Sequence, residues 1–328
     1  MKQWFARLFG SPREADSAHV HTVHAPAAPI APADGEGEPA TINLDLAFFH
    51  WLVGPHVSGQ ASADNVILDE LIRLTRDPQA AAALVPRVPA VIPQLLRSLR
   101  DQDSSSGDLA RQLAQDAVLV AEVIREVNSP YYQPATPVRN LEGALLLLGQ
   151  NGLRMLLARV AFRPIISLQA GALARLAAPQ LWRQSEGSAL AASLLAPHHG
   201  ADPFEAYLAG MMHNIGLVVA LRVIDQLLPG GGLPDDDVFG ARLIQGARLM
   251  SAGIAGQWEL PPAIGHAIAH AGDPDGLPAA LGEADRLAKL QMLAGGSHPD
   301  VARAVQALAP DARQVYDKLS EKDQQREA

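Results

Sequence analysis

Residues 116–130 read DAVLVAEVIREVNSP, and residues 209–216 read AGMMHNIG. In the first stretch, apolar residues recur every three or four positions, which is typical of one buried face of a helix. Its last residues, Asn128-Ser129-Pro130, predict the end of that helix, because proline cannot continue the hydrogen-bond ladder and restricts the residue before it. The second stretch indicates the end of one helix, a tight turn and the start of another.

The helical period continues on both sides of these two stretches. Asn140 and Asp202 are expected N-caps, Asn151 caps a further helix through Val160, and Gly149 is an expected left-handed helix stop. Two helices are expected between residues 86 and 113. The others are expected over residues 116–127, 141–148, 181–196, 203–212, 217–228, 237–258, 262–270, 281–293 and 301–319. No segment needs a strand, so the sequence predicts an all-α fold.

The N-terminal part of the chain divides in two. Residues 1–40 are rich in Pro, Ala, Gly and charge, which predicts a disordered segment and linker. Residues 41–84 regain the helical pattern and predict a helical extension. Its first helix has an apolar stripe formed by Leu44, Phe48, Trp51 and Leu52 and broken at Gly54-Pro55, and its second begins at Asp64.

The first ten residues contain a short amphipathic piece, with Trp4, Phe5, Leu8 and Phe9 on one helical face. Two interpretations stay open: a weak anchor to a membrane or a partner, or a frayed chain terminus.

Composition limits the classes of function. The net charge of −9 gives nucleic-acid binding no general electrostatic help, so no nucleic-acid partner is expected. The absence of cysteine excludes disulfides, thiol catalysis and cysteine-ligated zinc. No apolar run reaches the ~20 residues of a membrane helix, and the first residues lack a secretory signal core. These features fit a cytoplasmic protein.

Several motifs together resemble a known family. They are Asn128-Ser129-Pro130-Tyr131-Tyr132, Leu148-Gly149, Leu181-Trp182, Ala209–Gly216 and Trp258-Glu259-Leu260-Pro261. In this order they are similar to the HD-related output domain, called HDOD, over about residues 85–285, with C-terminal helices and a tail in 286–328. The resemblance implies an all-helical domain of bacterial signalling proteins, related to the HD phosphohydrolases but generally lacking their catalytic set.

The resemblance also implies where a degenerate HD site would lie. An HD hydrolase holds divalent metal with a His, a His-Asp pair and a later Asp. In this sequence these positions correspond to Gln184, His213-Asn214 and Asp285, and His270 lies where related hydrolases often carry a further His. A neutral amide and a glutamine replace two ligands, and hard cations favour charged oxygens. The sequence therefore predicts no catalytic metal, no cofactor and no enzymatic activity.

For two of these residues a purely structural role stays open. His213 is either a ligand-contacting group or a helix-end histidine that bonds to nearby backbone. Asn214 is suited to capping the next helix.

Three functions follow for the whole chain. The leading hypothesis is a non-catalytic regulatory module that binds an unknown protein partner. The second is a metal-dependent phosphohydrolase with unusual ligands, and the third is a sensor that binds a nucleotide in the remnant cleft.

Overall fold

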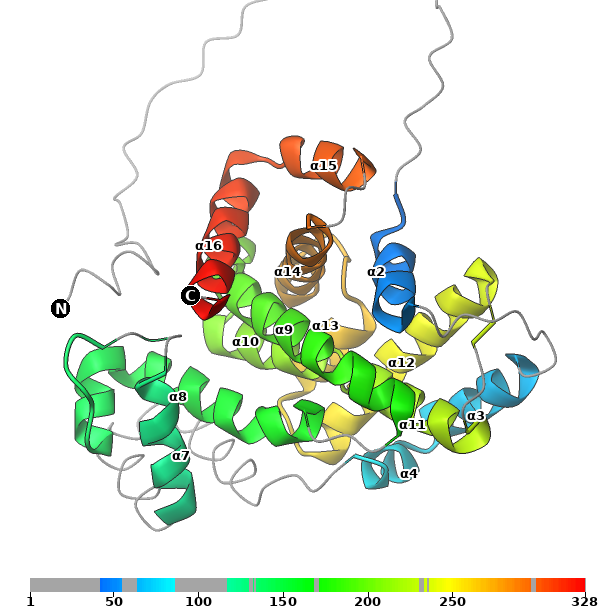
Figure 1. The fold of residues 1–328 in the computed structure, drawn as a ribbon, viewed down its shortest axis with the longest axis horizontal. Helices are drawn as coiled ribbons and strands as arrows, with labels where there is room; N and C mark the ends of the chain where they lie inside the picture. Colours follow the sequence, from blue (N-terminus) through cyan, green and yellow to red (C-terminus); the bar gives the residue numbers. More distant parts are fainter. Residues whose placement is uncertain are drawn as a thin grey trace, which may run out of the picture. The chain divides into compact units, whose positions relative to one another are not determined.

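A computed structural model describes residues 42–54, 64–85, 117–129, 132, 134–167, 171–229, 233–234, 236–295 and 299–327. The helices, labelled as in Figure 1, are α2 (Leu44–Val53), α3 (Asp64–Arg76), α4 (Pro78–Ala83), α7 (Ala117–Val127), α8 (Leu141–Ser167), α9 (Ala172–Leu195), the 3-10 helix η2 (Ala196–His199), α10 (Pro203–Met212), α11 (Ile215–Leu227), α12 (Asp237–Gln257), α13 (Pro262–Ala269), α14 (Gly276–Leu293), α15 (Pro299–Gln306) and α16 (Pro310–Glu327). The described residues contain no β-strand, which confirms the all-α prediction. The predicted linker over residues 1–40, its amphipathic start and the helices expected between 86 and 113 lie outside the described residues.

Residues Asn43–Ala328 form one unit, distinct from Met1–Ile42. Helix α9 runs through the middle of this unit, and α2, α8, α10, α11, α14 and α16 all pack on it (Figure 1). Helix α9 therefore contacts helices from both ends of the chain. Its buried face carries small residues such as Ala189 and Ala192, which let neighbouring helices approach closely.

Several helix ends follow directly from the sequence. The Asn140 side chain accepts a hydrogen bond from the Gly143 N–H at 2.9 Å, and Asp202 accepts from the N–H groups of Phe204 and Glu205 at 2.9 and 2.8 Å. Helix α7 ends at Val127, as the following Asn-Ser-Pro predicts. These caps satisfy backbone donors that have no partner within the helix.

Several helix boundaries differ from the prediction, among them the start of α14, which is Gly276 rather than Leu281, and the end of α8, which is Ser167 rather than Val160. Helix α9 begins at Ala172 rather than near Leu181, and Pro179 lies inside it. Gly149 was predicted correctly as a break: its φ of 71° and ψ of 179° are not helical, so α8 consists of two helical segments that meet at a kink, although this ψ is not that of a left-handed helical residue. The expected helix over 301–319 is two helices, because Pro310 starts a new one, and the second reaches Glu327.

A buried ion cluster joins α7, α8 and α9. The Arg159 guanidinium on α8 contacts the carboxylates of Glu126 on α7, at 3.1 Å, and Glu186 on α9, at 2.5 Å. All three side chains are buried, and Arg163 reaches Glu126 from the surface. Such clusters hold helices in one relative position, because removing a member leaves an uncompensated buried charge.

The helices before residue 85 pack on the later part of the chain. Helix α2 contacts α9, α12 and α14, while α3 and α4 contact α12. Phe48, Phe49, Leu52 and Val53 are buried beneath α2. Trp51, predicted as part of the apolar stripe, is instead 41% exposed. The buried face therefore includes Phe49 and Val53 in its place.

Two helical stretches are long and apolar enough to span a membrane on length and composition alone, Leu141–Ser167 and Pro203–Leu227. The second is 89% buried inside the unit and is interrupted by the turn at His213-Asn214. Its apolar character is that of a core element.

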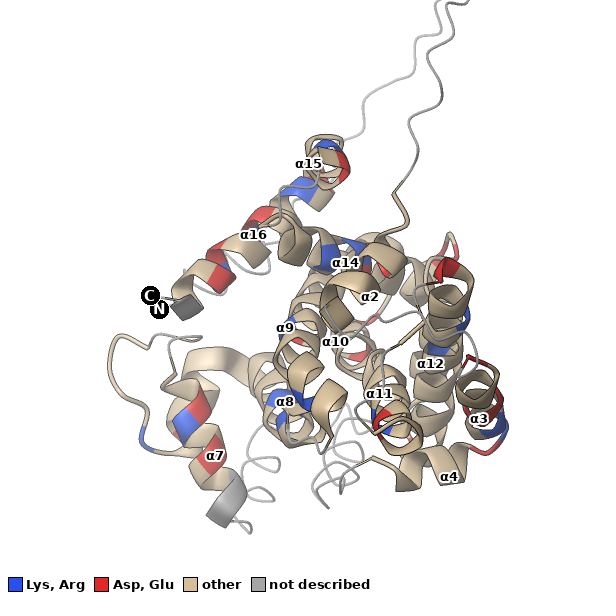
Figure 2. Cartoon of the chain, turned by 45° about the vertical axis from the view of Figure 1, so that its right-hand side comes forward, with Lys and Arg blue, Asp and Glu red and all other residues tan. Residues whose placement is uncertain are grey.

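Helices α3 and α7 carry residues of both charge signs (Figure 2). Neither helix therefore presents the uniformly basic surface that a protein uses to bind a phosphate backbone.

Candidate functional site

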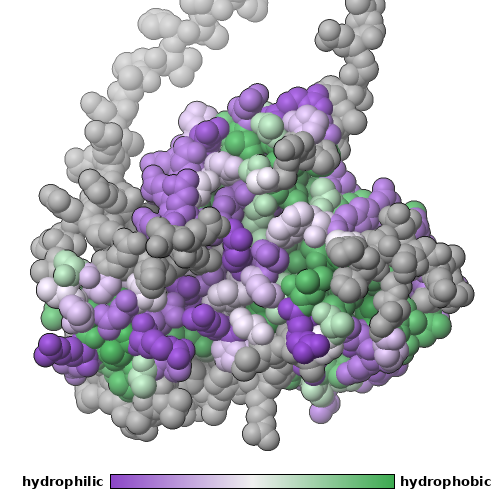
Figure 3. Space-filling view, viewed as in Figure 1, coloured by the Kyte–Doolittle hydropathy of each residue, from purple (hydrophilic) through white to green (hydrophobic). Residues whose placement is uncertain are grey.

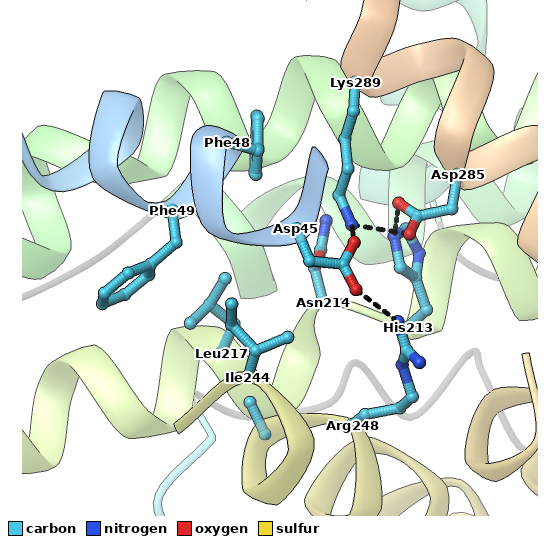
Figure 4. Close-up of a pocket in the computed structure, with 11 residues that line it drawn as sticks. Asp45, Phe48, Phe49, His213, Asn214, Leu217, Ile244, Arg248, Asp285 and Lys289 are labelled. Atoms are coloured by element: carbon cyan, nitrogen blue, oxygen red, sulfur yellow. Dashed lines mark hydrogen bonds and ion pairs between the residues drawn. The ribbon is translucent and has the colours of Figure 1, made fainter. Parts of the chain in front are cut away.

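The candidate site lies where α9, the α10–α11 turn and α14 meet. Gln184 comes from α9, His213 and Asn214 from the turn, and Asp285 from α14. The structure thus brings together four of the five site residues predicted from the sequence. Figure 4 shows His213, Asn214 and Asp285 along one wall of a cavity, with α2 on the opposite side.

Two glycines position the α10–α11 turn. A Cβ added at Gly210 would lie 2.5 Å from the Ala189 Cα on α9, and one added at Gly216 would lie 1.9 Å from the Ala247 carbonyl oxygen on α12. Only glycine permits these two backbone contacts, since both distances are far below van der Waals separation. The glycines on either side of His213 and Asn214 therefore fix this turn against two neighbouring helices.

Ser251 on α12 completes the turn. Its hydroxyl oxygen accepts a hydrogen bond from the Gly216 N–H at 2.8 Å, and the hydroxyl donates to the His213 carbonyl at 2.7 Å. The Ser251 side chain therefore hydrogen-bonds both to His213 in the turn and to Gly216 in the first turn of α11. The site residues sit on a rigid support.

Amide side chains occupy the centre of the cluster. Asn214 donates to the Gln184 carbonyl oxygen and to the Ser185 hydroxyl at 3.2 Å. Gln184 in turn donates to the Ser188 hydroxyl at 3.0 Å and to Asp285 Oδ1. The Asn214 side chain makes no capping hydrogen bond to α11, so the capping role suggested by sequence is wrong. Its amide is used inside the cluster instead.

His213 serves both the backbone and the cluster. Its Nδ1 lies 2.6 Å from the Gly210 carbonyl oxygen, so this nitrogen carries a proton and donates it. Its Nε2 faces inward, 3.0 Å from Gln184 Nε2 and 3.2 Å from Asp285 Oδ1. The backbone bond expected for a helix-end histidine is present, and so is the contact with the other site residues.

His270, the fifth predicted residue, lies apart. Its ring packs on His266 with centroids 4.4 Å apart, and its Nδ1 is 3.5 Å from Asp273 Oδ2. Its side chain is 51% exposed. In the described part of the chain it makes no contact with the other four.

A buried lysine that sequence reasoning missed completes the site. Lys289, one helical turn after Asp285, is only 6% exposed, and its ammonium nitrogen lies 2.6 Å from Asp285 Oδ2. The same nitrogen lies 2.6 Å from Asp45 Oδ1 on α2, and Asp45 Oδ2 is 3.3 Å from the Arg248 guanidinium on α12. The i, i+4 spacing of Asp285 and Lys289 on one helix could have indicated their ion pair from the sequence. Asp45 is too distant in sequence from Lys289 and Arg248 for any local pattern to indicate its contacts with them.

The charges in this cluster stabilise one another. Burial acts to raise the pKa of Asp285, but the Lys289 ammonium group, with a smaller contribution from the neighbouring His213 ring, outweighs it and holds that pKa far below its usual range. Burial acts to lower the pKa of Lys289, but the carboxylates of Asp285 and Asp45 outweigh it and raise that pKa. Both groups are charged at neutral pH, as a tight ion pair in a dry environment requires.

The donor set does not fit the metal centre that the HD resemblance implies. Among the described residues no three His, Asp or Glu side chains converge as metal ligands do. The Gln184 oxygen already accepts from Asn214, and the second oxygen of Asp285 is taken by an ammonium group. A divalent cation bound to Asp285 would lie close to the Lys289 ammonium group, and the two positive charges would repel each other. Lys289 already supplies the positive charge that Asp285 needs.

The cavity beside this cluster is small. Its volume is about 30 Å³, and its lining includes Asp45, Phe48 and Phe49 of α2 together with Asn214 and Lys289. This is room for one or two water molecules. A nucleotide does not fit while α2 is in place.

Comparison with known proteins adds a family and a fold. The family model of the HDOD domain matches residues 85–274. A search of curated proteins finds an uncharacterized protein of Treponema pallidum (strain Nichols), 26% identical over 146 residues, which are 44% of this chain and 28% of that protein. The chain thus matches little more than a quarter of the length of that relative.

Solved structures with the same fold come from several bacteria. An HDOD domain protein of unknown function from Geobacter sulfurreducens aligns with a TM-score of 0.58 at 22% identity, over 79% of this chain and 97% of that one. A candidate metal-dependent phosphohydrolase from Shewanella amazonensis SB2B aligns with a TM-score of 0.54 at 17% identity, over 80% and 99%. A candidate signal transduction protein from Marinobacter aquaeolei VT8 aligns with a TM-score of 0.54 at 18% identity, over 88% and 66%. At these identities the likeness concerns the fold.

Proposed function

The chain belongs to the HDOD domain family, and from this premise we propose that it is a non-catalytic signal-transduction module of the bacterial cytoplasm that acts by binding a protein partner. The fold is that of proteins described both as signal transduction proteins and as phosphohydrolases. The residues of the site favour the first of these roles.

One observation carries the proposal. The ammonium group of Lys289 lies 2.6 Å from Asp285, the carboxylate at the one acidic metal-ligand position that this chain retains. The two altered positions, Gln184 and Asn214, hydrogen-bond to each other. The site is therefore closed by its own side chains, which form a satisfied polar network in place of ligands awaiting an ion.

Exposed apolar side chains support a protein partner. Figure 3 shows apolar surface gathered right of centre in that view and interrupted by polar residues elsewhere. Exposed apolar patches on soluble proteins often mark interaction sites. Large exposed apolar residues occur on α2, α3 and α12, namely Trp51, Val66, Ile72, Val238 and Leu249.

The proposal is tested by measuring metal and turnover together. The purified chain is incubated with Mn²⁺ or Fe²⁺, desalted, and analysed for bound metal and for hydrolysis of an aryl phosphodiester and a cyclic dinucleotide. We expect no stoichiometric metal and no turnover above that of His213→Ala. A bound divalent ion per chain, with turnover that His213→Ala abolishes, would overturn the proposal.

A gain-of-ligand series tests the role of Lys289 directly. Gln184→His with Asn214→Asp restores the ligand types, and we expect this double variant to bind Mn²⁺ weakly because the ammonium group remains. Adding Lys289→Ala should tighten Mn²⁺ binding by about tenfold or more, comparable with changes in outer-shell support at metal sites. Equal affinity in the double and triple variants would show that Lys289 does not exclude the ion.

The second candidate function is a metal-dependent phosphohydrolase with unusual ligands. It is favoured by His213 Nε2 and Asp285 Oδ1, which retain two HD ligand types 3.2 Å apart. The same metal and turnover measurements separate it from the first. A nucleotide sensor is less well supported, since the cavity of about 30 Å³ is far smaller than a ligand pocket.

A further inference from the structure

The carboxylate of Asp45 bridges two cations across the cleft. Its Oδ1 lies 2.6 Å from the Lys289 ammonium nitrogen, and its Oδ2 lies 3.3 Å from the Arg248 guanidinium (Figure 4). We propose that Lys289 and Arg248 form an oxyanion-binding site in which Asp45 is a tethered occupant, so that α2 competes with any phosphate or carboxylate ligand of this cleft.

The charge balance of the cluster favours an anion at this position. Lys289 and Arg248 carry two positive charges, while Asp285 provides one negative charge from inside the cluster. Asp45 supplies the second. In the described part of the chain, the ion pair of Arg248 is with Asp45 alone. Without that carboxylate a net positive charge would remain between the buried Lys289 and the Arg248 guanidinium, which is 31% exposed, and this charge would attract an anion from solvent.

The geometry is that of oxyanion recognition. Each oxygen of the Asp45 carboxylate faces a different cation, as happens when one carboxylate or phosphate group is held by a lysine and an arginine. The two cations come from α14 and α12, which the fold holds in fixed positions. Neither cation therefore belongs to the helix that fills the site.

The occupant comes from outside the matched domain. Asp45 lies in the first turn of α2, before the residues 85–274 that match the family model. Behind it on the same helix, Phe48 and Phe49 line the cavity. One helix thus supplies both an anion for the cation pair and an apolar cover, so an incoming oxyanion has to replace Asp45.

This inference rests on the proposed function in one respect, namely that Lys289 rather than a metal ion carries the positive charge of the site. Two independent measurements distinguish a failure of this inference from a failure of the proposed function. Oxyanion binding is measured in the presence of a chelator, and bound metal is measured on the same samples.

The test is chemical rescue of the full chain. Asp45→Ala vacates the site beside the existing cavity, and thermal unfolding is followed while phosphate or acetate replaces chloride at constant ionic strength. We expect the unfolding midpoint of Asp45→Ala to rise saturably with one of these anions, by about 3 °C or more. The unchanged chain should move by about 1 °C or less, since Asp45 already fills its site. The stronger of the two anions identifies the ligand as phosphate-like or carboxylate-like.

Two further variants make the result specific. Asp45→Ala combined with Arg248→Ala should lose the saturable rise. Asp237→Ala, which removes an exposed carboxylate on α12, should respond as the unchanged chain does. If Asp45→Ala does not fold, Asp45→Asn serves for the same titration.

Each outcome of these titrations either supports or overturns the inference. A saturable rise that needs Arg248 and persists with chelator supports the inference. Absence of a rise, or an equal rise in Asp237→Ala, overturns it and leaves the proposed function standing. A rise that appears only with bound metal overturns both.

Discussion

A buried lysine stays charged in a folded protein only when its charge is compensated, most directly by carboxylates. Lys289 has two, on α14 and α2, and each of them depends on it in return. Asp285 is the more dependent of the two because it is itself buried. At the scale of single residues, the ion pair Asp285–Lys289 is therefore the feature of the site with the clearest consequences for stability.

Lys289→Met should destabilise the protein strongly. The methionine fills a similar volume but leaves Asp285 buried without its ammonium partner, which typically costs about 3–5 kcal/mol. Urea unfolding at pH 7 measures the loss. Combining Lys289→Met with Asp285→Asn removes both charges and should recover most of it. A double variant as unstable as the single one would mean that packing, not charge, sets the cost.

The same pair predicts a pH dependence. The pKa of Asp285 is lower in the folded than in the unfolded chain, so its contribution is present above the unfolded pKa of about 3.9 and declines as the pH falls below it. The raised pKa of Lys289 keeps that group charged throughout this acidic range. The difference in unfolding free energy between the unchanged chain and Asp285→Asn should shrink by about 1 kcal/mol between pH 6 and pH 3. A difference that stays constant or grows contradicts the assignment.

At the scale of elements, the α10–α11 turn owes its position to glycine. Gly210 and Gly216 allow backbone contact with α9 and α12, and the site residues between them follow. The motif AGMMHNIG therefore has two roles. Its glycines allow close packing against α9 and α12, and its His213 and Asn214 side chains lie in the site.

Gly216→Ala tests this packing. Its Cβ would lie 1.9 Å from the Ala247 carbonyl oxygen, so α11 and α12 would have to separate, and we expect a loss of about 3 kcal/mol or more, at the upper end for overpacked cores. Gly256→Ala is the matched control on α12, because nothing lies within 4 Å of its Cβ position. That variant should change stability by less than about 1 kcal/mol, in the stabilising direction. Denaturant unfolding compares them, and equal losses would refute the packing argument.

Local sequence signals predicted many of the helix ends. The start of α9 at Ala172 was missed, and the reason can be identified. Asn140 and Asp202 cap their own helices, so sequence alone was sufficient there. The first turn of α9 is capped by Asp225 on α11, whose carboxylate oxygens accept from the N–H groups of Leu173 and Ala174 at 3.0 and 2.9 Å. A cap supplied by a residue some fifty positions away leaves no local pattern, and Pro179 further obscured the helix.

At the scale of the whole molecule, the chain closes on itself at the candidate site. Asp45 contacts Lys289 although the two residues are 244 positions apart. The resemblance to the HD-related family indicated Gln184, His213, Asn214 and Asp285, because the family's motifs can be aligned with this sequence. The ion pairs of Lys289 with Asp45 and of Asp45 with Arg248 depend on tertiary packing, so sequence reasoning found the remnant site but not the helix that covers it.

This closure raises the question of whether α2 unfolds with the rest of the chain or on its own. It has only ten residues, fewer than the ~12–15 an isolated helix needs, so leaving its binding face also means losing its helical structure. It packs on α9, α12 and α14 through one apolar face, whereas α9 is surrounded by other helices. A short element attached by one face at the end of a unit is expected to open before the core does.

We therefore predict that α2 opens independently. Its amide hydrogens should exchange with protection factors at least about 100-fold below those of α9, equivalent to ~3 kcal/mol in opening free energy. Phe48→Ala should lower protection in α2 by a further ~100-fold or more, since truncating a buried phenylalanine typically costs about 3–5 kcal/mol, and should leave α9 unchanged. Trp51→Ala, on the more exposed side of the same helix, should have a smaller effect.

Hydrogen exchange followed by mass spectrometry measures the protection of the two helices separately. If α2 and α9 exchange together and Phe48→Ala weakens both equally, α2 is an integral part of the core, and an external oxyanion could replace Asp45 only through a local movement of that partly exposed side chain.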